Sequence, residues 1–174
     1  VETPAAVRQE PALRNRMGLE LMDALAALSR IDPVAAGLSD FGKLDGFLER
    51  QVARWASELD SYDRFEGWDG PAALGNVGSV GKWLTDHCPK AMQPGIIHGD
   101  YHIGNGIFGE DGQLRAVVDW EMSTLGDPLV DLGRILISWP NGKSGRPHTM
   151  RVDPLGGYPS RSEMVARYAE RSGR

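Results

Sequence analysis

Apolar residues that recur every three or four positions predict a helix near the start of the chain. Pro11 suits the first turn of a helix, and the helix is expected to end before Asp32 and Pro33. The apolar positions between them share one helical face: Leu13, Met17, Leu21, Ala24, Leu25 and Leu28. We therefore expect an amphipathic helix that packs against a core.

A second stripe at helical spacing predicts another helix across residues 44–59. It consists of Leu44, Phe47, Leu48, Val52, Trp55 and Leu59. A glycine-rich interval, residues 67–81, separates it from a shorter expected helix around Val77, Val80 and Leu84. Glycine inside a helix costs about 1 kcal/mol relative to alanine, so the shorter helix is the less stable of the two.

The middle of the chain changes to a strand pattern. Ile96 and Ile97 predict a short buried strand. Ile107 and Phe108, followed by residues 114–118, predict a hairpin whose turn, residues 109–112, contains glycines that tolerate positive φ. Such a hairpin would bring the residue that follows its second strand close to the residue that precedes its first strand.

Two further helices are expected near the end of the chain. Asp127 with Pro128 predicts one helix start, and Ser160 with Glu163 forms a capping-box pattern at another. The buried face of the first should contain Leu129, Leu132, Ile135, Leu136 and Trp139. Residues 141–157 are expected to form a polar loop. The chain as a whole is predicted to be α+β, mostly α, with helices around a small hairpin.

Composition limits the classes that remain. A chain of 174 residues with 41% hydrophobic content fits one domain, and no apolar run approaches the about 20 residues of a membrane helix. The formal net charge of −5 argues against nucleic-acid or membrane-surface partners. A lone Cys88 and no signal-peptide pattern favour a reducing, cytoplasmic location. We expect Trp55, Trp83, Trp120 and Trp139 to pack in the core or at its rim.

Residues 95–131 carry the candidate chemistry. Asp100 and Asn105 stand five positions apart, and Asp119 follows fourteen positions later, across the predicted hairpin. Mg²⁺ prefers oxygen ligands, which Asn105 and Asp119 could supply together. Asp100 would then be available to orient an acceptor hydroxyl, which is the main task of a protein in phosphoryl transfer.

Three motifs carry a resemblance to a known family. His98-Gly99-Asp100 with Asn105, followed by VDWE at 118–121, resembles the aminoglycoside phosphotransferase and choline kinase superfamily, which shares the protein-kinase fold. The longer stretches HGDYHIGN, DWEMSTLGDPLVDL and DPVAAGLSDFGKLDGFLERQVARW are similar to the phosphotransferase-like domain related to that fused to some acyl-CoA dehydrogenases.

The resemblance implies a role for each motif residue. Asp100 would be the catalytic base, and Asn105 and Asp119 would bind Mg²⁺ and, through it, the phosphates of ATP. His98 would shape the catalytic loop. His102 stands where relatives carry a lysine or arginine, so it would donate a hydrogen bond to the γ-phosphate. The implied activity is ATP-dependent phosphorylation of a hydroxyl on a small molecule.

Acidic residues after the second strand have open or structural interpretations. Asp131 is early in a helix that buries Leu132, and we expect it to hydrogen-bond the backbone of the catalytic loop or His98. Asp127 is expected to cap that helix. Glu121 is either a further carboxylate beside the metal or a solvated residue.

The resemblance also predicts where this chain lies in a larger domain. Residues 1–174 correspond to the large lobe, since residues 1–95 contain no nucleotide-covering strand-turn-strand loop with its lysine. Further helices usually follow in the family, so Met164, Val165 and Tyr168 would lack a packing partner. By itself the chain is expected to bind ATP weakly and to show no measurable turnover.

Two other classes of protein share features with this sequence. A pseudokinase, which is a nucleotide-binding or scaffold module without turnover, would keep the same lobe. His98 and Asp100 with a distant His148 also match the two-histidine, one-carboxylate pattern of non-haem Fe(II) oxygenases. That class needs a jelly roll of eight strands, and the sequence has too few strand signals to build one.

Overall fold

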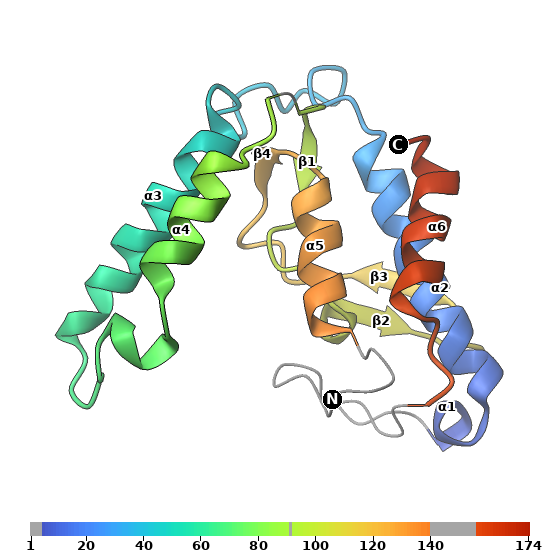
Figure 1. Ribbon diagram of the computed structural model, residues 1–174. Helices are drawn as coiled ribbons and strands as arrows, with labels where there is room; N and C mark the ends of the chain where they lie inside the picture. Colours follow the sequence, from blue (N-terminus) through green and yellow to red (C-terminus); the bar gives the residue numbers. More distant parts are fainter. Residues whose placement is uncertain (1–4, 91, 140–155) are drawn as a thin grey trace.

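The computed structural model describes residues 5–90, 92–139 and 156–174. The helices are α1 (Ala5–Gln9), α2 (Pro11–Ser29), α3 (Phe47–Asp60), α4 (Val77–Asp86), α5 (Leu129–Ser138) and α6 (Arg161–Ser172), with short 3₁₀ turns at Ser61–Arg64, Pro71–Leu74 and Ile103–Asn105. The strands are β1 (Gly95–Ile97), β2 (Gly106–Phe108), β3 (Leu114–Val117) and β4 (Thr124–Gly126), and Figure 1 shows their arrangement. Within these ranges no helix is long and apolar enough to cross a membrane.

The predicted start and end of helix α2 and the predicted start of helix α6 are confirmed. Helix α2 begins with Pro11 in its first turn and ends at Ser29, ahead of Asp32. At the start of α6 the Ser160 hydroxyl accepts the Glu163 backbone N–H at 3.2 Å, and the Glu163 carboxylate accepts the Ser160 backbone N–H at 2.7 Å. These bonds satisfy backbone groups that have no partner inside the helix, which is why the local sequence determines the helix start.

Helix α5 begins one residue later than Pro128 suggested. Pro128 is the N-cap residue, and the Asp127 carboxylate accepts the Leu129 backbone N–H at 3.0 Å. Leu132, Ile135 and Trp139 are buried as predicted, whereas Leu129 is exposed, so its assignment to the buried face was wrong. The hydrophobic core reaches α5 only one turn further on, at Leu132.

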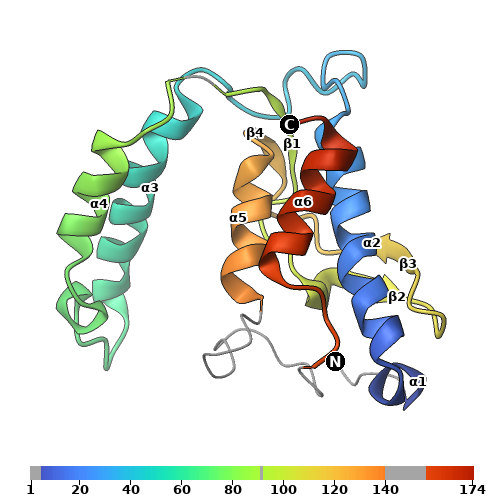
Figure 2. The same cartoon turned by 45° about the vertical axis from the view of Figure 1, so that its right-hand side comes forward.

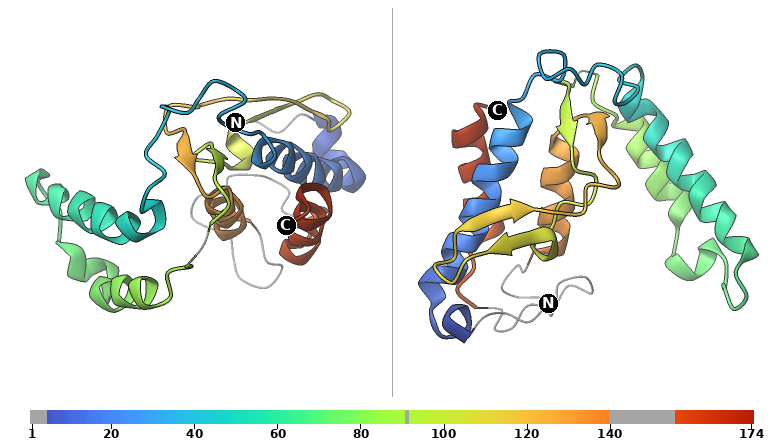
Figure 3. Two further views of the ribbon diagram at one scale, coloured as in Figure 1. Left: turned by 90° about the horizontal axis from the view of Figure 1, so that it is seen from above. Right: turned by 180° about the vertical axis from the view of Figure 1, so that it is seen from behind.

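The strands form two separate antiparallel pairs. Strands β2 and β3 are the predicted hairpin, with Gly106 opposite Val117 and Ile107 opposite Ala116. Strand β1 pairs with β4, with Ile96 opposite Leu125. The sequence did not predict β4, because a three-residue strand with a distant partner leaves little local pattern. The right-hand view in Figure 3 shows the hairpin crossing in front of the helices.

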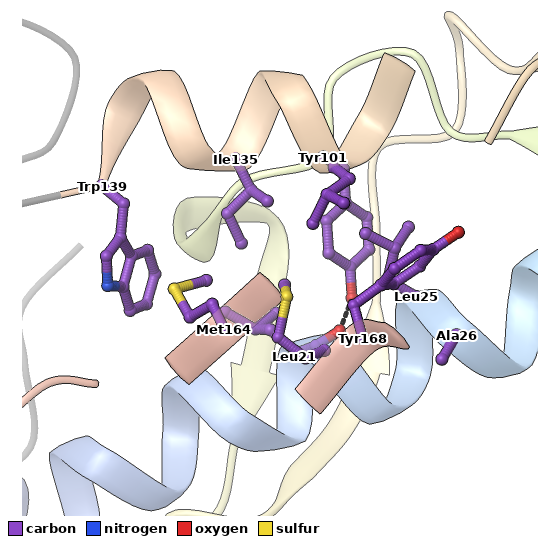
Figure 4. Close-up of a cluster of buried hydrophobic side chains, with 10 residues drawn as sticks. Leu21, Leu25, Ala26, Tyr101, Ile135, Trp139, Met164 and Tyr168 are labelled. Carbon is purple, nitrogen blue, oxygen red and sulfur yellow. Dashed lines mark hydrogen bonds between the residues drawn. The ribbon is translucent and has the colours of Figure 1, made fainter. Parts of the chain in front are cut away.

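The core forms where α2, α5 and α6 meet the loop that follows β1. Its buried members are Leu21, Met22, Leu25, Ala26, Tyr101, Leu132, Ile135, Trp139, Met164 and Tyr168, and Figure 4 shows them converging. Helix α6 lies along α2 (Figure 2), and the Arg167 guanidinium binds the Asp23 carboxylate through two hydrogen bonds of 2.7 Å. The expectation that Met164 and Tyr168 lack a partner was therefore wrong.

Helices α3 and α4 form an antiparallel pair that projects from the rest of the molecule (Figures 1 and 3). Of the tryptophans expected in the core or at its rim, Trp139 is fully buried, whereas Trp55, Trp83 and Trp120 are 55%, 58% and 41% exposed. The apolar side chains of this pair, together with Val130, line a groove of about 900 Å³.

The packing of α6 on α2 gives a first testable result. Met164→Ala removes a fully buried side chain and is expected to lower the free energy of unfolding by about 2 to 5 kcal/mol. Urea unfolding measures the loss. Val165→Ala, at the exposed neighbouring position, is the control and should change stability by less than about 0.5 kcal/mol. Equal losses in the two variants would contradict the observed packing.

Candidate active site

The loop that follows β1 is organised by His98, whose side chain is completely buried. One ring nitrogen, Nε2, lies 3.0 Å from the carbonyl oxygen of Val118, and Nδ1 accepts the Asp100 backbone N–H at 3.3 Å. These partners require a neutral ring with its proton on Nε2. His98 therefore links the start of the loop to the residue that follows β3.

Asp131 holds the same loop from helix α5. Its carboxylate accepts the backbone N–H of His98 at 2.6 Å and that of Gly99 at 2.9 Å. These are the backbone contacts that the sequence led us to expect. Burial raises the pKa of the Asp131 carboxyl, and the two N–H bonds act in the opposite direction because they favour its charged form.

The loop needs glycine at position 99. Gly99 has φ of 90°, a left-handed conformation that is strained for other residues. A side chain there would also collide with the carbonyl oxygen of Met122. The sharp turn directs the next residue, Asp100, away from the core and toward the surface of the lobe.

Removing the Asp131 carboxylate should weaken the fold measurably. In Asp131→Ala the backbone N–H groups of His98 and Gly99 lose their buried acceptor, which is expected to cost about 1 to 3 kcal/mol of unfolding free energy. A thermal or urea melt measures the change. Asp69→Ala, at an exposed position, is the matched control. An Asp131→Ala melt that matches that of the parent protein would contradict this anchoring role.

The carboxylate of Asp100 lies between two basic side chains. Arg134 of α5 donates a hydrogen bond to Oδ1 through Nε at 3.0 Å, and its Nη2 forms an ion-pair contact with the same oxygen at 2.8 Å. On the other side, His102 Nε2 lies 3.3 Å from Oδ2. Sequence reasoning missed Arg134. The available signal was its position three residues after Asp131, which places both side chains on one face of a helix.

The ring of His102 faces Asp100 in this structure. Its Nδ1 accepts the Gly104 backbone N–H at 3.0 Å, so in a neutral ring Nε2 carries the proton and points to Asp100. Gly104 allows this approach, because a Cβ atom there would lie 2.8 Å from the ring. Donation from His102 to a phosphate stays a prediction. It requires the ring to give up its contact with the Asp100 carboxylate.

Asn105 and Asp119 lie at the open end of the β2–β3 hairpin. Asn105 is buried, and its side-chain amide donates to the Asp100 carbonyl oxygen at 3.0 Å, which leaves its Oδ1 as the remaining acceptor. The Asn105 carbonyl accepts the Val118 backbone N–H at 2.9 Å. The residue after Val118 is Asp119, so the hairpin brings these two oxygen-bearing side chains to neighbouring backbone positions.

The conformation of Asp119 is unusual. Its φ is 70°, in the left-handed region that few residues other than glycine adopt, and its side chain is exposed. Within residues 5–90, 92–139 and 156–174 its carboxylate has no hydrogen bond or ion pair. An exposed carboxylate and a fixed amide oxygen are hard donors that suit Mg²⁺, whose remaining positions are filled by water and phosphate oxygens.

The iron-oxygenase alternative finds no support at His98. Both of its ring nitrogens already have protein partners, Val118 and Asp100. His148, the second histidine of that pattern, lies outside the described residues. In the part of the chain that the structure describes, no three histidine, cysteine, aspartate or glutamate side chains gather into a metal site.

Fold and site together define the class of protein. A mostly helical body with a short hairpin has Asp100 and Asn105 before the hairpin and Asp119 after it. The fold is that of phosphotransferases with a protein-kinase-like fold. The chain belongs to the phosphotransferase enzyme family, whose sequence profile matches residues 2–164. The resemblance inferred from the motifs is thus confirmed.

Two curated relatives carry a similar segment within much longer chains. Acyl-CoA dehydrogenase family member 11 of Gallus gallus is 36% identical over 124 residues, which are 70% of this chain and 15% of that protein. Acyl-CoA dehydrogenase family member 10 of Mus musculus is 32% identical over 130 residues, which are 74% of this chain and 12% of that protein. The chain therefore spans less than a fifth of these relatives.

Solved structures support the same fold. A protein from Ralstonia eutropha, solved as a candidate aminoglycoside phosphotransferase, is 32% identical with a TM-score of 0.75, over 95% of this chain and 49% of that one. A macrolide 2'-phosphotransferase from Brachybacterium faecium, at 19% identity and a TM-score of 0.60, covers 93% of this chain and 47% of that one. The second likeness bears on the fold alone.

Proposed function

We propose that the protein to which this lobe belongs transfers a phosphoryl group from ATP to a hydroxyl of a small molecule. The observation that carries the proposal is the position of Asp100. Its carboxylate is part-exposed on a loop whose backbone is fixed by Asp131, and the same loop ends at Asn105. A fixed carboxylate beside hard oxygen donors suits phosphoryl transfer, in which positioning and charge neutralisation dominate.

Each residue has a proposed role in this reaction. Asp100 accepts a hydrogen bond from the acceptor hydroxyl and receives its proton as the phosphoryl group is transferred. Asn105 and Asp119 hold Mg²⁺, which when bound supplies positive charge against the phosphate oxygens. His98 and Asp131 keep the loop in shape through their contacts with Val118 and with the loop backbone.

The test uses the intact protein. Calorimetric titration with Mg-ATP, beside a coupled ADP-release assay over a panel of hydroxylated small molecules, should show binding together with acceptor-dependent release. Absence of Mg-ATP binding would refute the proposal. Binding without acceptor-dependent release would instead favour a pseudokinase-type module.

A further inference from the structure

An ion pair joins the proposed base to helix α5. Nε of Arg134 donates a hydrogen bond to Oδ1 of Asp100 at 3.0 Å, and Nη2 of the same guanidinium lies 2.8 Å from that oxygen. The two side chains are 29% and 31% exposed, so water reaches both. A part-exposed pair of this kind adds little to the stability of a fold. Its presence at the proposed base therefore points to a role other than holding the lobe together.

Two residues of helix α5 contact the catalytic loop. Asp131 binds the backbone N–H groups of His98 and Gly99, and Arg134, one turn further along, binds the side chain of Asp100. The first contact fixes where the loop runs. The second restricts how the Asp100 carboxylate can turn, because two nitrogens of one planar guanidinium lie within 3.0 Å of the same oxygen.

The two oxygens of Asp100 consequently have different surroundings. Oδ1 accepts a hydrogen bond from Arg134 Nε and lies 2.8 Å from its Nη2, whereas in the part of the chain that the structure describes Oδ2 has only the longer contact with His102 at 3.3 Å. A carboxylate oxygen can accept more than one hydrogen bond. Oδ2 is therefore the atom that has capacity left for an acceptor hydroxyl.

We propose that Arg134 is a positioning residue that turns Asp100 so that Oδ2 faces the acceptor hydroxyl. The proposal rests on the proposed function, because it acts through the base. In this role Arg134 acts through Asp100 and does not itself bind the substrate. Its absence would let the carboxylate rotate, and misplacement of a reacting group by about 1 Å can cost about 100-fold in rate.

The experiment replaces Arg134 in the intact protein. Arg134→Gln is expected to lower kcat by about 10- to 100-fold, with KM for ATP changed by less than about 2-fold and an unchanged melting temperature. Arg134→Lys keeps the charge without the second donor, so it should recover part of the lost rate. A crystal structure of Arg134→Gln should show the Asp100 carboxylate turned from its present orientation.

The chain offers a matched control. Arg115 of β3 binds Asp111 at 2.8 Å in an exposed ion pair far from Asp100 in the fold, and Arg115→Gln should leave kcat unchanged. In an Asp100→Ala background, Arg134→Gln should cause no further loss, because its effect passes through the base. If Arg134→Gln lowered the rate of Asp100→Ala by as much as it lowers that of the parent, the positioning role would be wrong. A parental kcat for Arg134→Gln alone would also contradict it.

The two proposals fail in different ways. If the intact protein does not release ADP in response to any acceptor, the proposed function is wrong, and the role of Arg134, which depends on it, is wrong as well. If the intact protein is active, Asp100→Ala is inactive and Arg134→Gln keeps the parental kcat with Asp100 unmoved, only the positioning role is wrong.

Discussion

Replacing Asp100 with alanine is expected to abolish phosphoryl transfer in the intact protein while leaving Mg-ATP affinity nearly unchanged. Loss of a general base typically lowers a rate by about 100- to 10,000-fold. The affinity should survive because the proposed metal ligands are Asn105 and Asp119, and the contact of Asn105 with this loop is to the Asp100 backbone carbonyl. Coupled ADP release and calorimetric titration measure the two quantities separately.

Asp100→Asn is the matched variant. It keeps the shape of the side chain and a carbonyl oxygen for Arg134 but is not a base, so its rate should fall almost as far as that of Asp100→Ala. A melting temperature near the parental value would show that the fold is intact. Full activity of either variant on an acceptor that the parent phosphorylates would contradict the role assigned to Asp100.

Removing the carboxylate of Asp119 is expected to damage both binding and turnover. If Asp119 holds Mg²⁺, Mg²⁺ should no longer raise the affinity of the Asp119→Ala variant for ATP. Its kcat should fall by at least about 100-fold, because the charge stabilisation that a metal supplies is worth several kcal/mol. Titrations with ATP in the presence of Mg²⁺ and of a chelator measure the first effect.

Asp119→Gly separates the metal role from backbone strain. Glycine adopts the φ of 70° at this position without cost, so the variant removes the carboxylate and leaves the turn unstrained. It should be as inactive as Asp119→Ala and at least as stable. If Mg²⁺ raised ATP affinity in Asp119→Gly as strongly as in the parent, the metal would be held elsewhere.

The local elements of this fold are readable from the sequence. Helix α2 starts at Pro11, the capping box starts α6, and the β2–β3 hairpin lies where two short apolar runs and the glycines between them predict it. These features depend on interactions between residues a few positions apart, so the pattern along the chain contains them. The order of the motifs also sufficed to indicate the family, which the sequence profile confirms over residues 2–164.

Burial was harder to predict, because it depends on what packs opposite a residue. Trp55 and Trp83 have the same helical pattern as core residues, yet they lie on the projecting α3–α4 pair and stay exposed. Met164 and Tyr168 are buried because α2 lies against α6. Periodicity identifies an apolar face, and only the tertiary structure decides whether another element covers it.

The sequence alone determined which residues are candidates for the chemistry, because Asp100, Asn105 and Asp119 follow one another along a loop and a hairpin. The tertiary structure decided how the first of them is held. Arg134 lies 34 positions from Asp100, and the sequence did not predict this contact. The contact of Asp131 with the loop at His98, 33 positions away, was expected, but the structure was needed to show that its partners are the backbone N–H groups of His98 and Gly99. Both exist because packing of α5 on α2 and α6 brings a helix end against the loop. Long-range contacts of this kind depend on the whole core, and no short window of sequence specifies them.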